Sequence, residues 1–280
     1  MKLRSLRNAK EKKIKSYGLL PWIDVNRMDW VFVSSNPAAI HFLEQHLDDI
    51  DWRELSANPS AIHLLEQNLD KIHWPNLSEN PSAIHLLEKN KDKICWSSLS
   101  SNPNAMHLLE QNLDKIDWDR LSENPSAIPL LKENPYKINW YLLSTNPAAI
   151  PLLELNTNKI NWSALSSNPN AMHLLKENPS LIDWNKLCEN TSAIPLLELN
   201  PHRLNWVKLS MNPSAIQLLE QNQDKIYWHL LCMNPSIFEP MQVWTKERLK
   251  DTIAEDLMKN RFHPKNMDNW EGWGHETDLN

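Results

Sequence analysis

The chain has 280 residues, of which 23% are charged, and its formal net charge is −6. Only three residues are glycine, which argues against tight β-hairpins and propeller blades, because their turns need residues with positive φ. No run of about 18 apolar residues occurs, so no membrane span is predicted, and the basic N-terminus lacks the apolar stretch of a secretory signal.

The first 18 residues form a basic arm that we expect to be flexible. Residues 1–15 contain seven basic residues and one acidic residue, so the rest of the chain is more acidic than the total of −6 indicates. An acidic body is a poor surface for nucleic acid, since binding to a duplex depends on neutralising its phosphates. We therefore do not expect nucleic acid as the main partner, and binding through the arm is kept as a second alternative function.

Residues 19–29 precede a long series of tryptophans and read as a degenerate half repeat. Stacked-repeat proteins need terminal caps with polar outer faces. We therefore predict an N-terminal cap at residues 19–29. After the repeats the pattern changes to a helical one, and we predict a C-terminal helical cap at residues 239–280.

Residues 30–238 are a tandem array with a period of 22 residues. Counted from each tryptophan as position 1, the repeat reads W-x-x-L-S-x-N-P-x-A-I-x-L-L-E-x-N-x-x-K-I-x. Such a period is typical of a solenoid, in which neighbouring repeats bury one continuous core. The tryptophans that begin repeats 1 to 10 are Trp30, Trp52, Trp74, Trp96, Trp118, Trp140, Trp162, Trp184, Trp206 and Trp228.

Each repeat is predicted to contain two helices. The frequent Asp or Asn at position 22 can cap a short helix that buries Trp at position 1 and Leu at position 4. Asn at position 7 can cap a longer helix, which starts with Pro and ends near the Asn at position 17 in a left-handed conformation. Pro at position 12 would remove a backbone hydrogen bond inside a helix that begins at position 8. Either the helix begins at position 9 in those repeats, which we favour, or it starts with an irregular turn. These prolines are Pro129, Pro151 and Pro195.

The predicted fold class is all-α, an α-solenoid of ten two-helix repeats with terminal caps, shaped as an elongated curving rod. Structural roles are assigned to Trp52, Trp74, Trp96, Trp118, Trp140, Trp162, Trp184 and Trp206, and to Asn58, Asn80, Asn102, Asn124, Asn146 and Asn168. The alternative is a leucine-rich-repeat-like α/β solenoid, which shares the 22-residue length. That alternative requires a core leucine at position 2, which instead holds residues such as Arg53 and Ser97.

Four motifs together resemble a group of viral proteins. The entry W-I-D-x-N-x-x-D-W, the units L-S-x-N-P-x-A-I-x-L-L-E, the exit N-P-S-I-F-E and the later F-H-P-K-N are similar to uncharacterised 22-residue tandem-repeat proteins of giant DNA viruses. The resemblance covers residues 19–280. It implies a viral protein made in a host cell, and it brings no catalytic residues.

No catalytic, cofactor or metal site is predicted. Position 12 carries a row of histidines, but neighbours about 10 Å apart cannot share one metal ion, so we expect an exposed row that is sensitive to pH near about 6. Glu at position 15 and Lys at position 20 are expected to form weak ion pairs between repeats. The histidines are His41, His63, His85, His107 and His173, and the three cysteines, Cys95, Cys188 and Cys232, are expected to be unpaired thiols, as in a reducing compartment.

The sequence therefore predicts a non-enzymatic scaffold or adaptor that binds a host or viral protein along the solenoid surface. An architectural component of a virion is the alternative, and we expect a monomer inside the host cytoplasm or the virion. Apolar residues at variable positions of the later repeats are the predicted partner-binding residues. They are Tyr141, Leu142, Leu155, Leu199, Met211 and Met233. Val31 and Phe32 are also apolar and are expected to pack on the N-terminal cap.

Overall fold

A computed structural model describes residues 18–238 of the chain. The predictions for the basic arm, apart from Gly18, and for the C-terminal cap at residues 239–280 lie outside the described residues. The chain divides into two compact units between Phe238 and Glu239, which is where the repeat pattern ends.

The described residues form an all-α solenoid, as the sequence predicts. Helices and turns follow one another from Val25 to Ile237, and residues 18–238 contain no strand, only an isolated antiparallel bridge between Leu19 and Phe238. The leucine-rich-repeat-like alternative is therefore wrong, because it requires a strand in every repeat.

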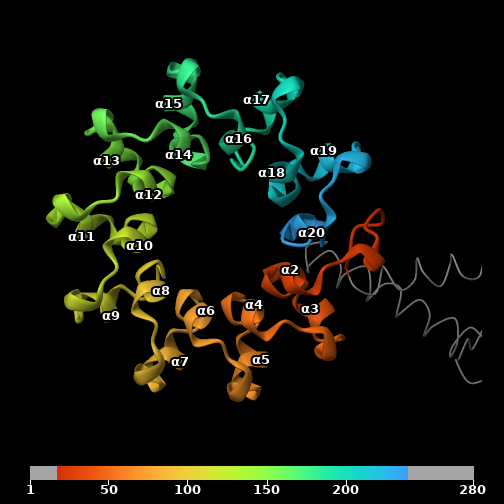
Figure 1. Ribbon diagram of the computed structural model, residues 1–280, viewed down its shortest axis with the longest axis vertical. Coiled ribbons are helices and arrows are strands. Elements are labelled where there is room, and N and C mark those ends of the chain that lie inside the picture. Colours follow the sequence, from red (N-terminus) through yellow and green to blue (C-terminus); the bar gives the residue numbers. More distant parts are fainter. Residues whose placement is uncertain (1–17, 239–280) are drawn as a thin grey trace, which may run out of the picture. The chain divides into compact units, whose positions relative to one another are not determined.

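Each repeat contributes one α-helix to an inner row, and repeats 1 to 9 each contribute one to an outer row (Figure 1). The inner helices are α2 (Trp30–Ser35), α4 (Trp52–Ala57), α6 (Trp74–Glu79), α8 (Trp96–Ser100), α10 (Trp118–Glu123), α12 (Trp140–Thr145), α14 (Trp162–Ser166), α16 (Trp184–Leu187), α18 (Trp206–Met211) and α20 (Trp228–Leu231). The outer helices are α3 (Ile40–Leu43), α5 (Ile62–Gln67), α7 (Ile84–Lys89), α9 (Met106–Glu110), α11 (Ile128–Glu133), α13 (Ile150–Glu154), α15 (Met172–Glu177), α17 (Ile194–Glu198) and α19 (Ile216–Glu220).

In most repeats the second helix is not longer than the first, which corrects the prediction. A short 3₁₀ turn follows each outer helix, and in repeats 1, 5, 6, 7 and 9 another precedes it, so the outer helix is shortened. Before the outer helix the turns are Pro37–Ala39, Pro125–Ala127, Pro147–Ala149, Pro169–Ala171 and Pro213–Ala215, and Pro235–Ile237 occupies the same positions of repeat 10. After it they are Leu47–Asp49, Leu69–Lys71, Lys91–Lys93, Leu113–Lys115, Pro135–Lys137, Thr157–Lys159, Pro179–Leu181, Pro201–Arg203 and Gln223–Lys225, with Val25–Arg27 near the N-terminus.

The outer helix starts late, as predicted, but at position 11 and not at position 9, and in repeat 5 a 3₁₀ turn at Pro125–Ala127 precedes it. Helix α11 begins at Ile128, so Pro129 is its second residue, where the missing N–H has no helical acceptor to lose. The predicted left-handed end is wrong. Asn68 at position 17 has φ −136° and ψ 55°, and its side-chain amide donates to the carbonyl of Leu64 at 2.8 Å. That hydrogen bond satisfies a carbonyl at the end of the helix without a left-handed residue.

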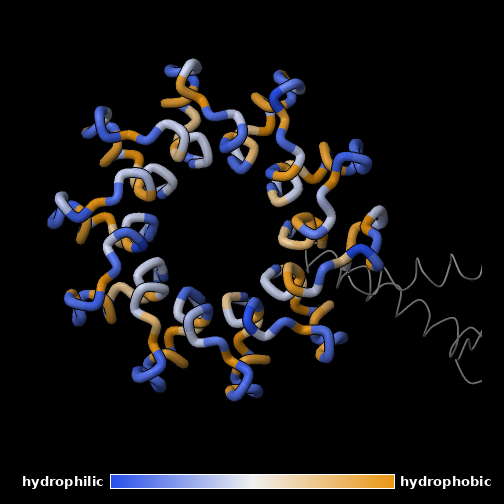
Figure 2. Tube along the Cα trace, in the orientation of Figure 1, coloured by the Kyte–Doolittle hydropathy of each residue, from blue (hydrophilic) through white to orange (hydrophobic). Residues whose placement is uncertain are grey.

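The core lies between the two rows of helices, where Figure 2 shows the apolar segments, while hydrophilic segments form the outer tips. Leu at positions 4 and 14 and Ala at position 10 are fully buried, as in Leu55, Leu65 and Ala61. The tryptophans lie at the edge of this core and are only half-buried. In seven repeats a cation covers the exposed indole face, and Lys71 Nζ lies 4.4 Å from the centre of the Trp52 ring.

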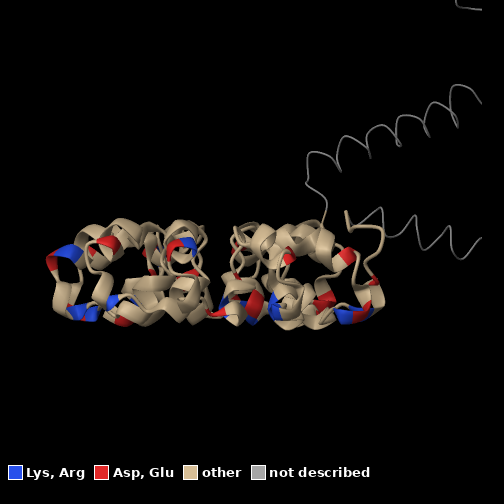
Figure 3. Cartoon of the chain, turned by 90° about the horizontal axis from the view of Figure 1, so that it is seen from above, with Lys and Arg blue, Asp and Glu red and all other residues tan. Residues whose placement is uncertain are grey.

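Residues 18–238 close into a ring, so the predicted elongated rod is wrong. Figure 1 shows α20 beside α2, and seen edge-on the ring is one flat layer (Figure 3). The same hydrogen bonds join each repeat to its neighbour. The rotation from one repeat to the next therefore accumulates in one direction, and the ten repeats together complete one circle.

The asparagines at position 7 form the repeating link, which we call the asparagine ladder. The amide nitrogen of Asn58 donates to the carbonyls of Ser34 and Asn36 in the preceding repeat, both at 3.0 Å. Its amide oxygen accepts the N–H of Ser60, which is the predicted cap. The ladder comprises Asn36, Asn58, Asn80, Asn102, Asn124, Asn146, Asn168, Asn190, Asn212 and Asn234, all of them buried. Asn36 closes it by donating to the carbonyls of Cys232 at 2.8 Å and Asn234 at 3.1 Å.

Repeat 10 is assembled from both ends of the described chain. Residues 228–238 supply its positions 1–11, and residues 19–29 supply positions 12–22. Leu20 N–H donates to the Ile237 carbonyl at 2.9 Å, which reproduces the bond from position 13 to position 10 seen in the continuous repeats. The segment predicted as an N-terminal cap is therefore the second half of the last repeat, and the two ends cover each other.

We call the contacts between residues 19–29 and 228–238 the seam. Asp29 N–H donates to Cys232 Sγ at 3.3 Å, in the same way that Asn205 N–H donates to Cys188 Sγ at 3.3 Å within repeat 8. Arg27 lies 4.2 Å from the centre of the Trp228 ring, as Lys does at position 20 of other repeats. The seam therefore repeats the contacts of a continuous repeat.

Replacing Cys188 by serine should leave the protein equally stable or stabilise it by about 0.5–1.5 kcal/mol. In repeat 9 the hydroxyl of Ser210 accepts the N–H of Tyr227 at 3.0 Å and donates to the Trp206 carbonyl at 2.7 Å, and serine at 188 gains the same pair. Cys188→Ala should instead be destabilising, because the N–H of Asn205 loses its acceptor. Urea denaturation measures both variants, and a Cys188→Ser variant less stable than Cys188→Ala would contradict this account.

Candidate interaction surface

The row of histidines lies on the outer helices, and its members pair with the glutamates at position 15. Those glutamates were expected to pair with the lysines at position 20. His63 Nε2 lies 2.9 Å from Glu44 Oε1 of the preceding repeat, and His85, His107 and His173 contact the glutamate at position 15 in the same way, at 2.8–3.0 Å. The predicted Glu–Lys pairing is therefore replaced by His–Glu pairing, since lysines at position 20 lie over tryptophan rings. Within residues 18–238, no group of three or more His, Cys, Asp or Glu is arranged to hold a metal ion.

Glu44 is the glutamate that contacts two histidines. Partial burial raises its pKa, but hydrogen bonds from His41 Nδ1 at 3.0 Å and His63 Nε2 at 2.9 Å, together with the charges of the two rings, lower it more. The net result is a pKa below the usual value. The unfolded chain therefore binds a proton at Glu44 before the folded chain does, and the stabilisation is lost as pH falls through the lowered folded pKa.

Glu44→Gln should therefore reduce stability most at pH values above the lowered pKa of Glu44, where the carboxylate is ionised, and progressively less as pH falls through that pKa. The matched control is Glu110→Gln, because the next repeat carries Pro129 where repeats 1 to 4 carry histidine. Thermal denaturation at a series of pH values measures both. Equal pH profiles for the two variants would show that the histidine pairs do not contribute.

The six predicted partner-binding residues do not form one surface. Tyr141 and Leu142 lie on inner helix α12, whereas Leu155 and Leu199 follow outer helices α13 and α17 and are about 80% exposed. Met211 ends inner helix α18, and Met233 lies just after α20. Two of the six, Met211 and Met233, therefore lie near the seam, and the other four lie elsewhere on the ring.

Positions 3 and 6 of the inner helices contact each other between repeats. Lys208 Nζ lies 2.7 Å from Glu189 Oε1, which joins position 3 of repeat 9 to position 6 of repeat 8. By the same correspondence of positions 3 and 6, Leu230 of repeat 10 is matched with Met211 of repeat 9. Across the seam, Phe32 of repeat 1 is matched with Met233 of repeat 10. The pair between repeats 8 and 9 is therefore an ion pair, whereas the pairs between repeats 9 and 10 and between repeats 10 and 1 consist of apolar side chains.

Aromatic residues extend this apolar surface. Tyr227 occupies position 22, where seven other repeats have a capping Asp or Asn, and 45% of its surface is exposed. Its ring centre lies 6.3 Å from that of His229, which in turn lies 5.9 Å from that of Phe32. We define the seam patch as the six residues around His229, namely Val31, Phe32, Met211, Tyr227, Leu230 and Met233.

Val31 and Phe32 were predicted to pack on a cap. Phe32 does pack against the core, but 44% of Val31 is exposed, and both lie beside repeat 10. Tyr227 was not selected from the sequence. The sequence did contain a sign that Tyr227 matters. At position 22 it replaces a capping residue that stabilises a helix by about 1 kcal/mol.

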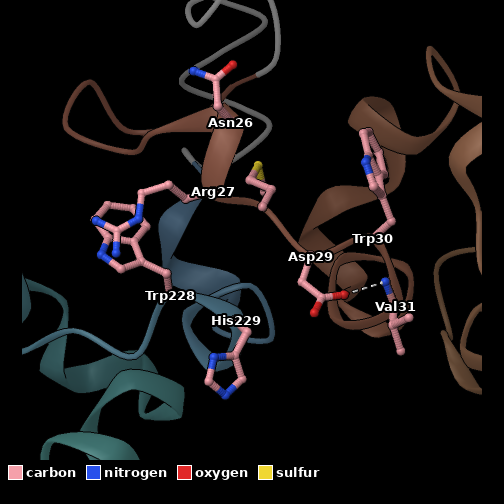
Figure 4. Close-up of a pocket in the computed structure, with 8 residues that line it drawn as sticks. Asn26, Arg27, Asp29, Trp30, Val31, Trp228 and His229 are labelled. Atoms are coloured by element: carbon pink, nitrogen blue, oxygen red, sulfur yellow. Dashed lines mark hydrogen bonds between the residues drawn. The ribbon is translucent and has the colours of Figure 1, made fainter.

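A shallow depression of about 660 Å³ adjoins the seam patch (Figure 4). The Arg27 guanidinium lies against Trp228, and the Asp29 carboxylate accepts the N–H of Val31 at 3.0 Å. Because Asp29 is engaged in this cap, the depression presents the guanidinium of Arg27 and the imidazole of His229 beside apolar side chains. Its lining residues are Asn26, Arg27, Met28, Asp29, Trp30, Val31, Trp228 and His229.

Comparison with known proteins finds no family model, no curated protein and no solved structure that matches this chain. Among the described residues, no helix is long and apolar enough to cross a membrane.

Proposed function

We propose that the protein is a non-enzymatic scaffold whose ring binds a protein partner, host or viral, through the seam patch. The observation that supports this most is the change at positions 3 and 6, where Lys208 pairs with Glu189 but the next two pairs are apolar. Protein interfaces are enriched in aromatic residues and methionine at their centres and are depleted in charge there. The seam patch has this composition.

The ring is suited to present such a surface. In every repeat the asparagine ladder and the position-5 side chains form buried hydrogen bonds to the backbone, so the inner helices are held in one arrangement. A partner that binds a preformed surface loses little conformational entropy of the scaffold on binding. The resemblance to repeat proteins of giant viruses makes an infected host cell the first place to look for the partner.

The test is the triple variant Val31→Ser, Met211→Ser and Met233→Ser. These side chains lie outside the buried core, so the far-UV circular dichroism spectrum and the melting temperature should stay close to those of the unmodified protein. Capture of the main partner, followed by binding measurements with that partner in purified form, should show a loss of affinity of at least 100-fold. Interface anchors of this kind commonly contribute most of the binding energy.

The matched control is Tyr141→Ser with Leu142→Ser in repeat 6, three to five repeats away around the ring from the three substituted residues. This variant should bind the partner as the unmodified protein does. Loss of binding in the control with retention in the triple variant would place the site elsewhere on the ring. Loss of binding only on deleting residues 1–17, with strong salt dependence, would indicate the basic arm and nucleic acid.

A further inference from the structure

Repeat 10 is the only repeat of the described ring whose two halves are not joined by a peptide bond. In repeats 1 to 9 the chain runs directly from position 11 to position 12. In repeat 10 those positions are Phe238 and Leu19, which meet in an antiparallel bridge. Anywhere else, two neighbouring parts of the ring stay tethered when their contacts break, whereas at the seam they can separate.

We propose that the ring opens and recloses at the seam, by release of residues 18–29 from residues 228–238 and of the Asn36 amide from the carbonyls of Cys232 and Asn234. The contacts that hold the segment are few compared with those of the whole ring. They comprise the hydrogen bonds from Leu20 to Ile237 and from Asp29 to Cys232, the ring contacts of Arg27 and Trp22 with Trp228, and the burial of Leu19 and Ile23. Opening of the ring also breaks the two hydrogen bonds from Asn36 to the carbonyls of Cys232 and Asn234. Segments held by few contacts at a chain end open with lower free energy than the body of a fold.

Closure is coupled to the proposed partner site, and this part rests on the proposed function. The seam patch takes Val31 and Phe32 from the N-terminal side of the seam, and Tyr227, Leu230 and Met233 from the C-terminal side. A partner that contacts both sides binds the closed ring more tightly than the open one. By mass action it therefore shifts the equilibrium toward closure.

Two cysteines provide matched reporters of this opening. Cys188 and Cys232 both occupy position 5, are 0% and 3% exposed, and accept a backbone N–H at 3.3 Å. Burial raises the pKa of both thiols, so neither is activated in the closed ring. The donor to Cys188 is Asn205 of the same continuous repeat, whereas the donor to Cys232 is Asp29, which leaves with the released segment.

The first test is alkylation of the full, native chain with iodoacetamide, with each cysteine quantified by mass spectrometry. Cys232 should react at least tenfold faster than Cys188, after each rate is normalised to the rate of the same thiol in denaturant. Rates equal within twofold, or a faster Cys188, would show that the seam opens no more readily than a continuous repeat and would overturn the proposal.

The second test locks the seam with a disulfide in the variant Leu19→Cys with Phe238→Cys. Bridged residues of antiparallel strands have Cα atoms about 4.5–5.5 Å apart, which suits a disulfide. Oxidation should lower the Cys232 rate to that of Cys188, and reduction should restore it. An unchanged Cys232 rate in the oxidised variant would overturn the proposal. If the seam opens but a saturating partner leaves the Cys232 rate unchanged, only the coupling to the proposed partner site is wrong.

Discussion

Replacing Asn124 by alanine should lower the free energy of unfolding by about 3–5 kcal/mol, well beyond the value of about 1 kcal/mol for loss of a helix cap. The Asn124 amide nitrogen donates to the carbonyls of Ser100 and Asn102, both at 3.0 Å, and the amide oxygen accepts the N–H of Ser126 at 2.9 Å. Asn124 is fully buried, so alanine leaves two carbonyls and one N–H without these partners. Each buried polar group left unsatisfied costs about 1–3 kcal/mol.

Asn134→Ala is the control within the same repeat. Its amide donates one hydrogen bond, to the Leu130 carbonyl at 3.0 Å, and the residue is half-buried. This change should cost about 1 kcal/mol. Chemical denaturation followed by circular dichroism measures both variants. Equal losses for Asn124→Ala and Asn134→Ala would show that the links between repeats do not stabilise the ring beyond ordinary helix capping.

Deletion of residues 1–29 should destabilise the protein far more than deletion of residues 1–17. The longer deletion removes Leu19 and Ile23, each 2% exposed, and burial of two such side chains stabilises by about 3–6 kcal/mol. It also removes the Asp29 N–H that donates to Cys232 and the Arg27 side chain that covers Trp228.

The measurements are the melting temperature and the alkylation rate of Cys232. The shorter deletion should leave both unchanged, because it keeps Leu19, Ile23, Arg27 and Asp29 with their contacts to repeat 10. The longer deletion should lower the melting temperature and expose Cys232. Equal behaviour of the two deletions would mean that residues 18–29 do not complete the tenth repeat in solution.

Local features of the repeat could be predicted from the sequence because they depend on spacing. The 22-residue period, the two helices, the caps at positions 7 and 22 and the late start at Pro129 all follow from propensities within one repeat. The second role of the asparagines could not be derived from capping alone. A sign of it was nevertheless present, since serine, threonine and aspartate also cap helices, but all ten repeats have asparagine at position 7. An amide is needed there because it donates as well as accepts.

Ring closure could not be predicted, since the rotation between repeats depends on packing angles that the repeat pattern does not specify. The division of repeat 10 between the two ends of the array could have been predicted from the sequence. Counting back from Trp30 assigns residues 19–29 to positions 12–22, and the register of repeat 10 fails after Phe238, at position 11. The seam patch required the structure, because Phe32 and Met233 are 201 residues apart and belong to the same surface only in a closed ring.

The asparagine ladder also restricts the number of repeats that the protein can have. An open solenoid can gain or lose a unit by duplication or deletion in its gene and still fold, because a new end is equivalent to the old one. Here every amide donates in the same sense around the ring, and Asn36 must meet the carbonyls of Cys232 and Asn234. Adding or removing one unit changes the rotation that each interface must supply for the ends to meet. Variants of this protein that change length by a whole repeat should therefore be excluded by selection, whereas point substitutions at the exposed positions are tolerated.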